Sequence, residues 1–240
     1  MLEASYFLIP TSYFLIPTSY ISCYNLKMFQ HIFFDLDSTL YSVRYGLEDY
    51  FFSRLKEYTN SWLALSLGLS AEECERLRME GYKRHGTTLA WLCTDMGFTA
   101  VDEYLEYVHP EDEADSLPPD PDLRSFLEAL PCPCSILTNS PLFHAERIIK
   151  KLGLEGVFTR IFDIKYNNGR GKPHASAYNR ALDCFGLKPY EVLFVDDLPH
   201  YVEGYLAIGG KGILLDEMDV HKDYPNERIR DLREITGFLC

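Results

Sequence analysis

The sequence lacks any run of about twenty apolar residues free of proline and charge, the length that a helix needs to cross a membrane. We therefore expect no transmembrane helix and no membrane partner. Basic residues are also few, since 23 Lys and Arg stand against 36 Asp and Glu, for a net charge of -13. Nucleic-acid binding depends on clustered Lys and Arg, so this balance argues against a nucleic-acid polymer as partner. Free nucleotides and other small metabolites remain possible ligands where nearby cations offset the negative electrostatic field of the protein.

Closely spaced cysteines are nearly absent as well. Among the seven cysteines, the only close pair is Cys132 and Cys134. No second pair is present to complete a zinc site. An odd number of scattered cysteines favours reduced structural thiols, and from this we expect a cytoplasmic protein. The 240 residues, 47% of them hydrophobic, suffice for one globular domain with an insertion.

The N-terminal segment contains an unusual repeat. Residues 5–11 recur without change as residues 12–18, and a third copy begins at Ser19. A proline in each copy forbids a continuous helix. We expect residues 1–27 to lie outside the fold, with translation starting at Met28. The alternative is an extended arm that packs on a neighbouring molecule.

The rest of the chain divides into two patterns. A helical region follows the first apolar strand and ends in an acidic, proline-containing connector. After it, helices alternate with short apolar strands, which is typical of a parallel sheet with right-handed crossovers. The sequence thus predicts an α/β fold, a doubly wound parallel sheet with a helical cap inserted after the first strand. The expected domains are a catalytic core at residues 28–43 and 118–240, and a helical cap domain at residues 44–117.

Helix and strand boundaries follow from capping signals and hydrophobic periodicity. In the cap we expect a helix over 46–62, a second from the capping box at Ser70, a third capped by Thr87 or Thr88, and a fourth capped by Thr99. In the core, the expected helices cover 122–130, 142–152, 175–185, 201–208 and 226–235, and the expected strands lie near 31–34, 134–137, 160–163, 192–195 and 212–215.

Two carboxylates end the first apolar strand abruptly. Asp35 and Asp37 stand two residues apart, and the hydroxyl of Ser38 follows. Nothing about strand burial requires Asp there, and ligands of open α/β sheets bind beyond the carboxyl ends of the strands. The alternative is a simple turn in which Asp37 bonds the backbone.

Other strand ends and helix starts carry polar groups too. Thr138 and Asn139 precede a helix whose N-terminal amides favour an anion. Lys172 precedes the helix expected at 175–185, and Asp196 and Asp197 follow another strand. Each alone could be a helix cap, a solvated charge or a turn. Together, carboxylates that repel one another require a cation, and hard oxygen ligands select Mg²⁺. One aspartate could then attack phosphorus as a nucleophile.

These segments resemble the four motifs of the haloacid dehalogenase-like hydrolase superfamily. The resemblance rests on residues 35–39, 138–139, 172–173 and 196–197, in that order and spacing. The inserted helical cap is similar to that of subfamily I. Within it, residues 82–90 resemble a stretch of the pyrimidine 5′-nucleotidase branch, with His85 where that branch usually has Tyr.

The resemblance implies a Mg²⁺-dependent phosphatase acting on a small-molecule phosphomonoester, most closely a nucleoside 5′-monophosphate. It makes Asp35 the nucleophile and Asp37 the general acid and base, and Lys172 a catalytic and phosphate-binding cation. The remaining implied roles are phosphate binding by Thr138 and Asn139, metal binding by Asp35, Asp196, Asp197 and the main-chain carbonyl of Asp37, and substrate contacts from His85, Thr87 and Thr88 of the cap.

Four alternatives stay open at this point. A sugar-phosphate phosphatase and a phosphomutase share all four motifs. A metal-free dehalogenase of the same fold has no use for Asp37 or for the pair Asp196 and Asp197. A non-catalytic binding protein on this scaffold would normally have lost a motif carboxylate or the lysine, and both are retained here.

Overall fold

The structure is a computed structural model that describes residues 29–239. The expectation for the N-terminal repeat and for Met28 lies outside the described residues. Within residues 29–239, no helix combines the length and the apolar character needed to span a membrane.

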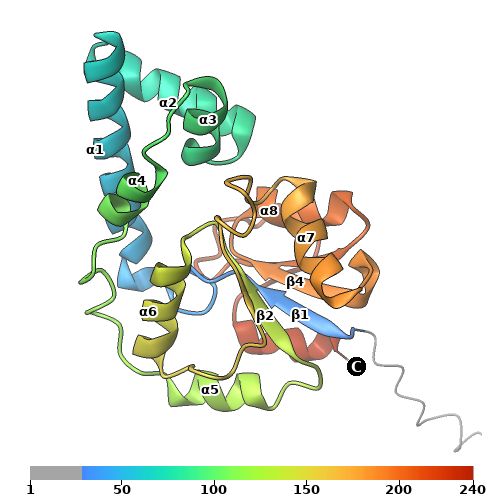
Figure 1. Cartoon of the computed structure of the whole chain (residues 1–240). Helices are drawn as coiled ribbons and strands as arrows, with labels where there is room; N and C mark the ends of the chain where they lie inside the picture. The colour runs from blue at the N-terminus through green and yellow to red at the C-terminus, as the bar shows by residue number, and fades with distance from the viewer. Residues whose placement is uncertain (1–28, 240) are drawn as a thin grey trace, which may run out of the picture.

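A six-stranded parallel sheet forms the centre of the core (Figure 1). Its strand order is β3-β2-β1-β4-β5-β6, with every neighbouring pair parallel. The predicted α/β fold with a parallel sheet is confirmed. The strands are β1 (His31–Phe34), β2 (Cys134–Leu137), β3 (Ile161–Phe162), β4 (Val192–Asp196), β5 (Lys211–Leu215) and β6 (Arg228–Ile229).

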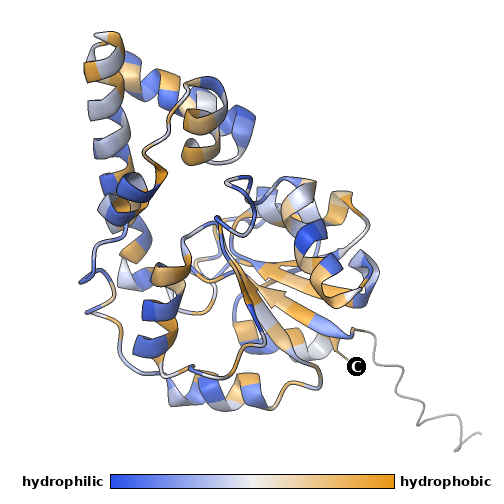
Figure 2. Ribbon diagram, in the orientation of Figure 1, coloured by the Kyte–Doolittle hydropathy of each residue, from blue (hydrophilic) through white to orange (hydrophobic). Residues whose placement is uncertain are grey.

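Helices cover both faces of the sheet because successive strand residues point to opposite sides. In β1, Ile32 and Phe34 belong to one apolar cluster, and Phe33 belongs to the other. The first cluster includes residues of α5 (Pro121–Glu128) and α6 (Leu142–Leu152), and the second includes residues of α7 (Ala175–Phe185) and α8 (Pro199–Ala207). The strands are accordingly apolar along most of their length (Figure 2).

The inserted segment folds into four helices that stand apart from the sheet, above it in Figure 1. They are α1 (Leu47–Leu67), α2 (Ala71–His85), α3 (Thr88–Asp95) and α4 (Val101–Val108). We call them the helical cap; the division of the chain at residues 44–117 stays a prediction.

Of the residues predicted to cap the N-termini of helices in this region, two are confirmed and one is wrong. Ser70 forms the expected capping box with Glu73 at the start of α2. Thr87 begins α3, where its hydroxyl oxygen accepts the N–H of Ala90 at 3.0 Å. Helix α4 is instead preceded by Ala100, without a side-chain cap, so the role predicted for Thr99 is wrong.

The helix predicted over 226–235 is also wrong. Arg228 and Ile229 form β6 beside β5, and a 3-10 helix, η4 (Leu232–Phe238), follows. The side chain of Asp231 starts η4 by accepting the N–H of Arg233 at 2.8 Å. Strand pairing across the sheet outweighs the local helical periodicity here.

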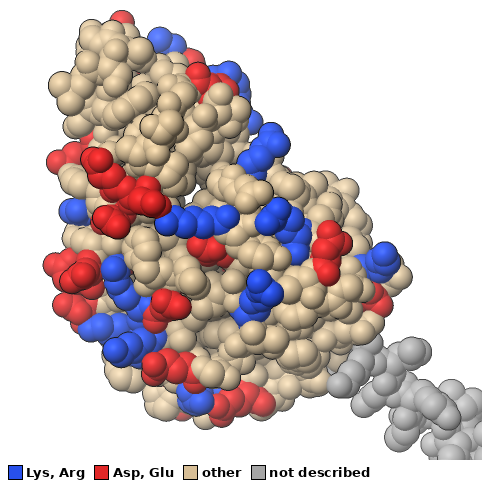
Figure 3. Space-filling view, in the orientation of Figure 1, with Lys and Arg blue, Asp and Glu red and all other residues tan. Residues whose placement is uncertain are grey.

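Charged side chains are mixed over the face of the molecule drawn in Figure 3, where Lys and Arg are interspersed with Asp and Glu. On this face they do not gather into one large basic patch.

Candidate active site

Strand pairing brings the first and last motifs together. Because β1 and β4 pair in register, with Phe34 opposite Val195, the residues that follow lie side by side at the same edge of the sheet. The N–H of Asp35 extends this ladder by donating to the carbonyl of Val195 at 2.9 Å. Asp35 and Asp196 are therefore neighbours, and both are buried.

Lys172 lies between these two carboxylates. Its Nζ donates to Asp35 Oδ1 at 2.5 Å and to Asp196 Oδ2 at 2.6 Å, and the side chain is fully buried. Burial alone lowers the pKa of Lys172, but the charges of Asp196 and Asp35 outweigh it and raise that pKa above its ordinary value. The lysine is therefore a permanent cation at this edge.

The backbone of Lys172 is clamped by the side chain of Asn139. Asn139 Nδ2 donates to the Lys172 carbonyl at 2.9 Å, and the Lys172 N–H donates to Asn139 Oδ1 at 2.7 Å. A Cβ atom at Gly171 would lie 1.9 Å from Asn139 Oδ1, so the clamp requires glycine there. Phosphate binding by Asn139 was expected from the sequence, but the clamp formed by its side chain was not. The available signal was the glycine directly before the lysine.

Asp37 is held by side chains from three directions. Its Oδ1 accepts hydrogen bonds from Tyr41 Oη and from His144 Nε2, both at 2.7 Å, and its Oδ2 accepts one from Ser140 Oγ at 2.8 Å. Burial alone raises the pKa of Asp37, but the charge and hydrogen bond of His144 outweigh it and hold that pKa well below its usual value. In turn, burial opposes the charge of Asp37 at His144, and the net effect raises the pKa of His144 to about 9.

Three carboxylates crowd the edge beside Lys172. Asp35, Asp196 and Asp197 each offer an oxygen within 4.8 Å of the others. Burial, and then the charges of Asp196 and Asp35, raises the pKa of Asp197 well above its ordinary value. Asp197 Oδ1 is buried without a hydrogen-bond partner among the described residues. Three carboxylates against one lysine leave a surplus of negative charge, and this oxygen-only set fits a hard divalent cation.

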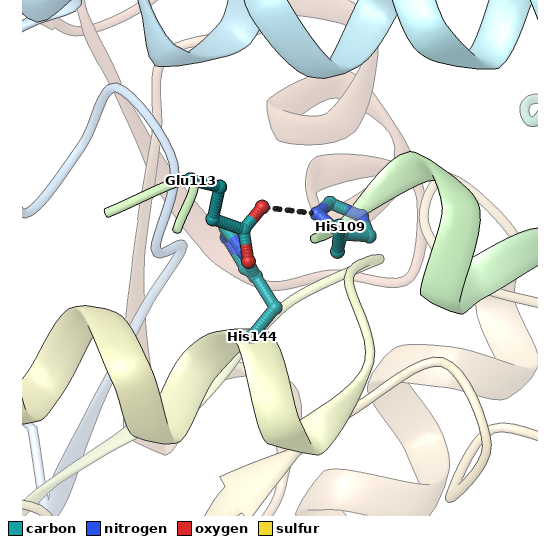
Figure 4. A group of neighbouring side chains, drawn as sticks. All are labelled: His109, Glu113 and His144. Carbon is teal, nitrogen blue, oxygen red and sulfur yellow. Dashed lines mark hydrogen bonds and ion pairs between the residues drawn. The ribbon is translucent and has the colours of Figure 1, made fainter. Parts of the chain in front are cut away.

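A second group of titratable side chains lies behind Asp37. His109, Glu113 and His144 are all buried and face one another (Figure 4). This group was not predicted from the sequence, because His144 lies far along the chain from His109 and Glu113. The only available signal was a histidine in the first turn of the helix that follows Thr138 and Asn139.

A cavity of about 550 Å³ lies between the sheet edge and the helical cap. Its wall on the core side includes Asp35, Asp37, Thr138, Asn139 and Lys172, and its wall on the cap side is mainly apolar, with Phe51, Leu55, Met79, Leu89, Tyr104 and Leu105. Five of the predicted core residues thus surround one space. Asp196 and Asp197 do not line the cavity but lie close to Asp35.

The predicted substrate residues of the cap are only partly brought to this cavity. Thr87 and Thr88 line it, although the hydroxyl of Thr87 also caps α3. His85 does not line it, because its Nε2 pairs with Asp95 Oδ2 at 3.0 Å. Its carbonyl instead accepts a hydrogen bond from His174 Nε2 at 2.8 Å, which joins the cap to the loop after Lys172.

Comparisons with known proteins agree with this architecture. A family model described as haloacid dehalogenase-like hydrolase matches residues 29–205. Among solved structures, the L-2-haloacid dehalogenase of Xanthobacter autotrophicus is 17% identical over 89% of this chain and 100% of its own, with a TM-score of 0.56. A HAD phosphatase from Thermococcus onnurineus is 21% identical over 88% and 97%, with a TM-score of 0.54. A haloacid dehalogenase-like family protein from Streptococcus pneumoniae is 19% identical over 89% and 99%, with a TM-score of 0.58. Similarity at these identities shows a shared fold.

Proposed function

The chain belongs to the haloacid dehalogenase-like hydrolases, and from this membership we propose that it is a Mg²⁺-dependent phosphomonoester hydrolase that forms an aspartyl-phosphate. The observation that carries the proposal is the pair of carboxylates after β1 in different surroundings. Asp35 contacts the buried Lys172 beside Asp196, and Asp37 lies among hydroxyl and imidazole donors. Two carboxylates with separate environments suit separate roles, one as nucleophile and one in proton transfer.

The first step transfers the phosphoryl group to the protein. A carboxylate oxygen of Asp35 attacks phosphorus, and the bond from phosphorus to the leaving oxygen breaks. Lys172 Nζ, next to Asp35, stabilises negative charge on the phosphoryl oxygens, and Thr138 with the backbone N–H of Asn139 holds them. On this proposal Asp37 is protonated in the substrate complex, although its pKa in the free protein lies below the usual value, and it gives the departing oxygen a proton. In the second step Asp37 takes a proton from water as the water attacks phosphorus, which releases phosphate and restores Asp35.

The carboxylates of Asp35, Asp196 and Asp197 would hold the Mg²⁺ ion. The ion supplies positive charge that offsets the developing charge of the transferred group. The buried, unpartnered Asp197 Oδ1 supports this assignment. The main-chain carbonyl of Asp37 is proposed as a further ligand on the family resemblance alone.

For the substrate we propose a nucleoside 5′-monophosphate. The cavity has the size of sites that hold ligands of this class, and Thr87 and Thr88 lie in its wall. Sugar-phosphate hydrolysis and phosphoryl transfer by a mutase remain the alternatives, because the core residues serve all three. We further propose a cytoplasmic location, supported by the absence of disulfides at Cys74, Cys93, Cys134 and Cys184 within the described residues.

A specific observation favours this proposal over dehalogenation, the activity for which some of the structural relatives are named. A metal-free dehalogenase needs neither a second carboxylate at Asp37 nor the pair Asp196 and Asp197. Here Asp37 is held by three hydrogen bonds at the cavity wall, and Asp197 adds a third carboxylate beside Asp35 and Asp196, a set that suits a divalent cation.

The test is a panel of UMP, CMP, sugar phosphates, 4-nitrophenyl phosphate and a 2-haloacid, assayed with chelator, Mg²⁺ or Ca²⁺. We expect phosphate release with Mg²⁺, none with chelator, and poor activity with Ca²⁺, whose longer bonds and higher coordination number spoil in-line geometry. Labelled phosphate that moves between sugars would indicate a mutase. Halide release in chelator would contradict the proposal.

A further inference from the structure

The buried group formed by His109, Glu113 and His144 joins three separate segments. His109 is the residue at which α4 of the cap ends, and Glu113 lies in the connector that leads from the cap to α5. His144 lies in the first turn of α6 in the core. Figure 4 shows Glu113 beside the two imidazole rings, whose centroids lie 4.4 Å apart. The group therefore lies where the helical cap returns to the core.

A continuous set of short contacts runs from this connector to Asp37. Glu113 Oε2 accepts a hydrogen bond from His109 Nδ1 at 2.9 Å, and Glu113 Oε1 forms an ion pair with His144 Nδ1 at 2.7 Å without the alignment of a hydrogen bond. His144 Nε2 then donates to Asp37 Oδ1 at 2.7 Å. The nitrogen on one side of the imidazole thus contacts Glu113, and the nitrogen on the other side contacts Asp37.

Arg147 fixes the far end of this set. Its guanidinium donates to Glu113 Oε1 at 3.1 Å and to the carbonyls of His109 and Pro110 at 3.0 and 3.1 Å. Glu113 is therefore anchored to α6 by a cation, and it cannot swing away from His144 without losing its contact with Arg147.

The group also has the composition of a metal site, since its three ligand atoms lie within 4.8 Å of one another. The contacts argue against that use. Both oxygens of Glu113 are already engaged, and the guanidinium of Arg147 lies 3.1 Å from one of them, where a second cation would be repelled. The charges of the group are paired without a metal.

We propose that His144 is a positioning residue for Asp37, with its ring orientation set by Glu113. The proposal rests on the proposed function, in which Asp37 transfers a proton. Tyr41 and Ser140 also hold Asp37, but their hydroxyls can act as donor or acceptor. The His144 imidazole is rigid, is 0% exposed and contacts Glu113 on its other side, so it presents a fixed donor to Asp37 Oδ1. Misplacement of a group that must reach a leaving oxygen is costly, because proton transfer depends on hydrogen-bond reach.

The experiment compares two esters of similar shape, phenyl phosphate and 4-nitrophenyl phosphate. Phenolate needs a proton to leave far more than nitrophenolate does, so the ratio of kcat/KM on the two esters reports proton transfer by Asp37. In the His144→Leu variant of the full chain we expect activity on phenyl phosphate to fall about tenfold more than activity on 4-nitrophenyl phosphate. His144→Gln, which retains a donor near the position of Nε2, should keep the ratio near that of the wild type.

Two further variants separate positioning from a loss of stability. His31→Leu also removes a buried histidine, at the far end of β1 from Asp35, and should lower the melting temperature without moving the ratio. Glu113→Gln retains the size of the side chain and should move the ratio in the same direction as His144→Leu, by a smaller factor. It keeps the proposal testable if His144→Leu fails to fold.

A double variant decides whether His144 acts through Asp37. In the Asp37→Asn background, His144→Leu should change the ratio no further, because the group that it positions is already gone. An equal loss on both esters, or an additional change in the Asp37→Asn background, would overturn the proposal. Wild-type protein that hydrolyses neither ester with Mg²⁺ would instead contradict the proposed function itself.

Discussion

The clamp between Asn139 and Lys172 offers a perturbation whose effect can be worked out from the structure. In the Gly171→Ala variant the new Cβ would lie 1.9 Å from Asn139 Oδ1 and 2.6 Å from its Cγ. Gly171 does not have a positive φ, so alanine fits the backbone and the collision is the whole effect. The side chain of Asn139 must move, and both hydrogen bonds to the backbone of Lys172 are lost.

The expected cost follows from those two bonds. Loss of each bond leaves a buried backbone group of Lys172 unpaired, and an unsatisfied buried group costs about 1–3 kcal/mol. We therefore expect a loss of about 2–6 kcal/mol in the free energy of unfolding. The loop that carries Lys172 then loses its anchor. A shift of about 1 Å at Nζ is enough for a hundredfold loss of turnover.

The assay combines urea unfolding with kcat/KM on 4-nitrophenyl phosphate. Asn139→Ala loses the same two bonds, and it also removes the atom that Gly171→Ala strikes. The double variant should therefore be about as stable as Asn139→Ala alone, apart from a contact with the flexible tip of Ile164 at 3.0 Å. Gly237→Ala is the matched control, because nothing lies within 4 Å of its Cβ. Additive losses in the double variant would refute the reasoning.

Three further predictions concern other parts of the molecule. Gly86→Ala should lower stability by about 1–2 kcal/mol and reduce turnover, because Gly86 has a φ of 78° and the added Cβ would lie 2.4 Å from Pro173 Cδ. Urea unfolding and steady-state kinetics test this prediction, and unchanged values would contradict it. Burial lowers the pKa of His31 to about 4, below its unfolded value, so stability should fall as the pH drops from 6.5 toward 4. His31→Leu should make that slope shallower, and an identical slope in the variant would disprove the assignment. Thr88→Ala should reduce kcat/KM on UMP and CMP about tenfold more than on 4-nitrophenyl phosphate. Thr87→Ala should instead cost about 1 kcal/mol of stability, because it removes a helix cap. Equal losses of the Thr88→Ala variant on all three substrates would argue against nucleotide recognition.

The sequence was sufficient to predict the sheet and the grouping of the core residues. Parallel strands place their carboxyl ends at one edge, so Asp35 and Asp196 had to meet once the strands were recognised, whereas Lys172 reaches them from the loop between β3 and α7. Contacts that depend on loop paths were beyond that argument. The clamp formed by Asn139, the pairing of His85 with Asp95, and the contact of His144 with Asp37 join side chains whose directions no periodicity fixes.

The wrong boundaries have the same origin. Residues 226–235 have helical spacing, yet Arg228 and Ile229 gain backbone hydrogen bonds from the open edge of β5, a partner that a local pattern cannot reveal. Likewise, Thr99 is a good capping residue by type, but the chain begins α4 one residue later, after Ala100. Local signals were reliable where the helix start was exposed and self-contained, as at Ser70.

The central claim is that Asp35 receives a phosphoryl group from the substrate, and it can be measured directly. In the Asp37→Asn variant, transfer of the phosphoryl group from an ester with a good leaving group should be faster than hydrolysis of the aspartyl-phosphate. The variant is mixed with Mg²⁺ and 4-nitrophenyl phosphate, quenched in acid, reduced with borohydride and mapped by peptide mass. An acyl phosphate at Asp35 would be reduced to homoserine at that position alone, and Asp35→Asn should show no such product. Phosphate release by the wild-type protein without any modification at Asp35, or modification at another carboxylate, would contradict the account.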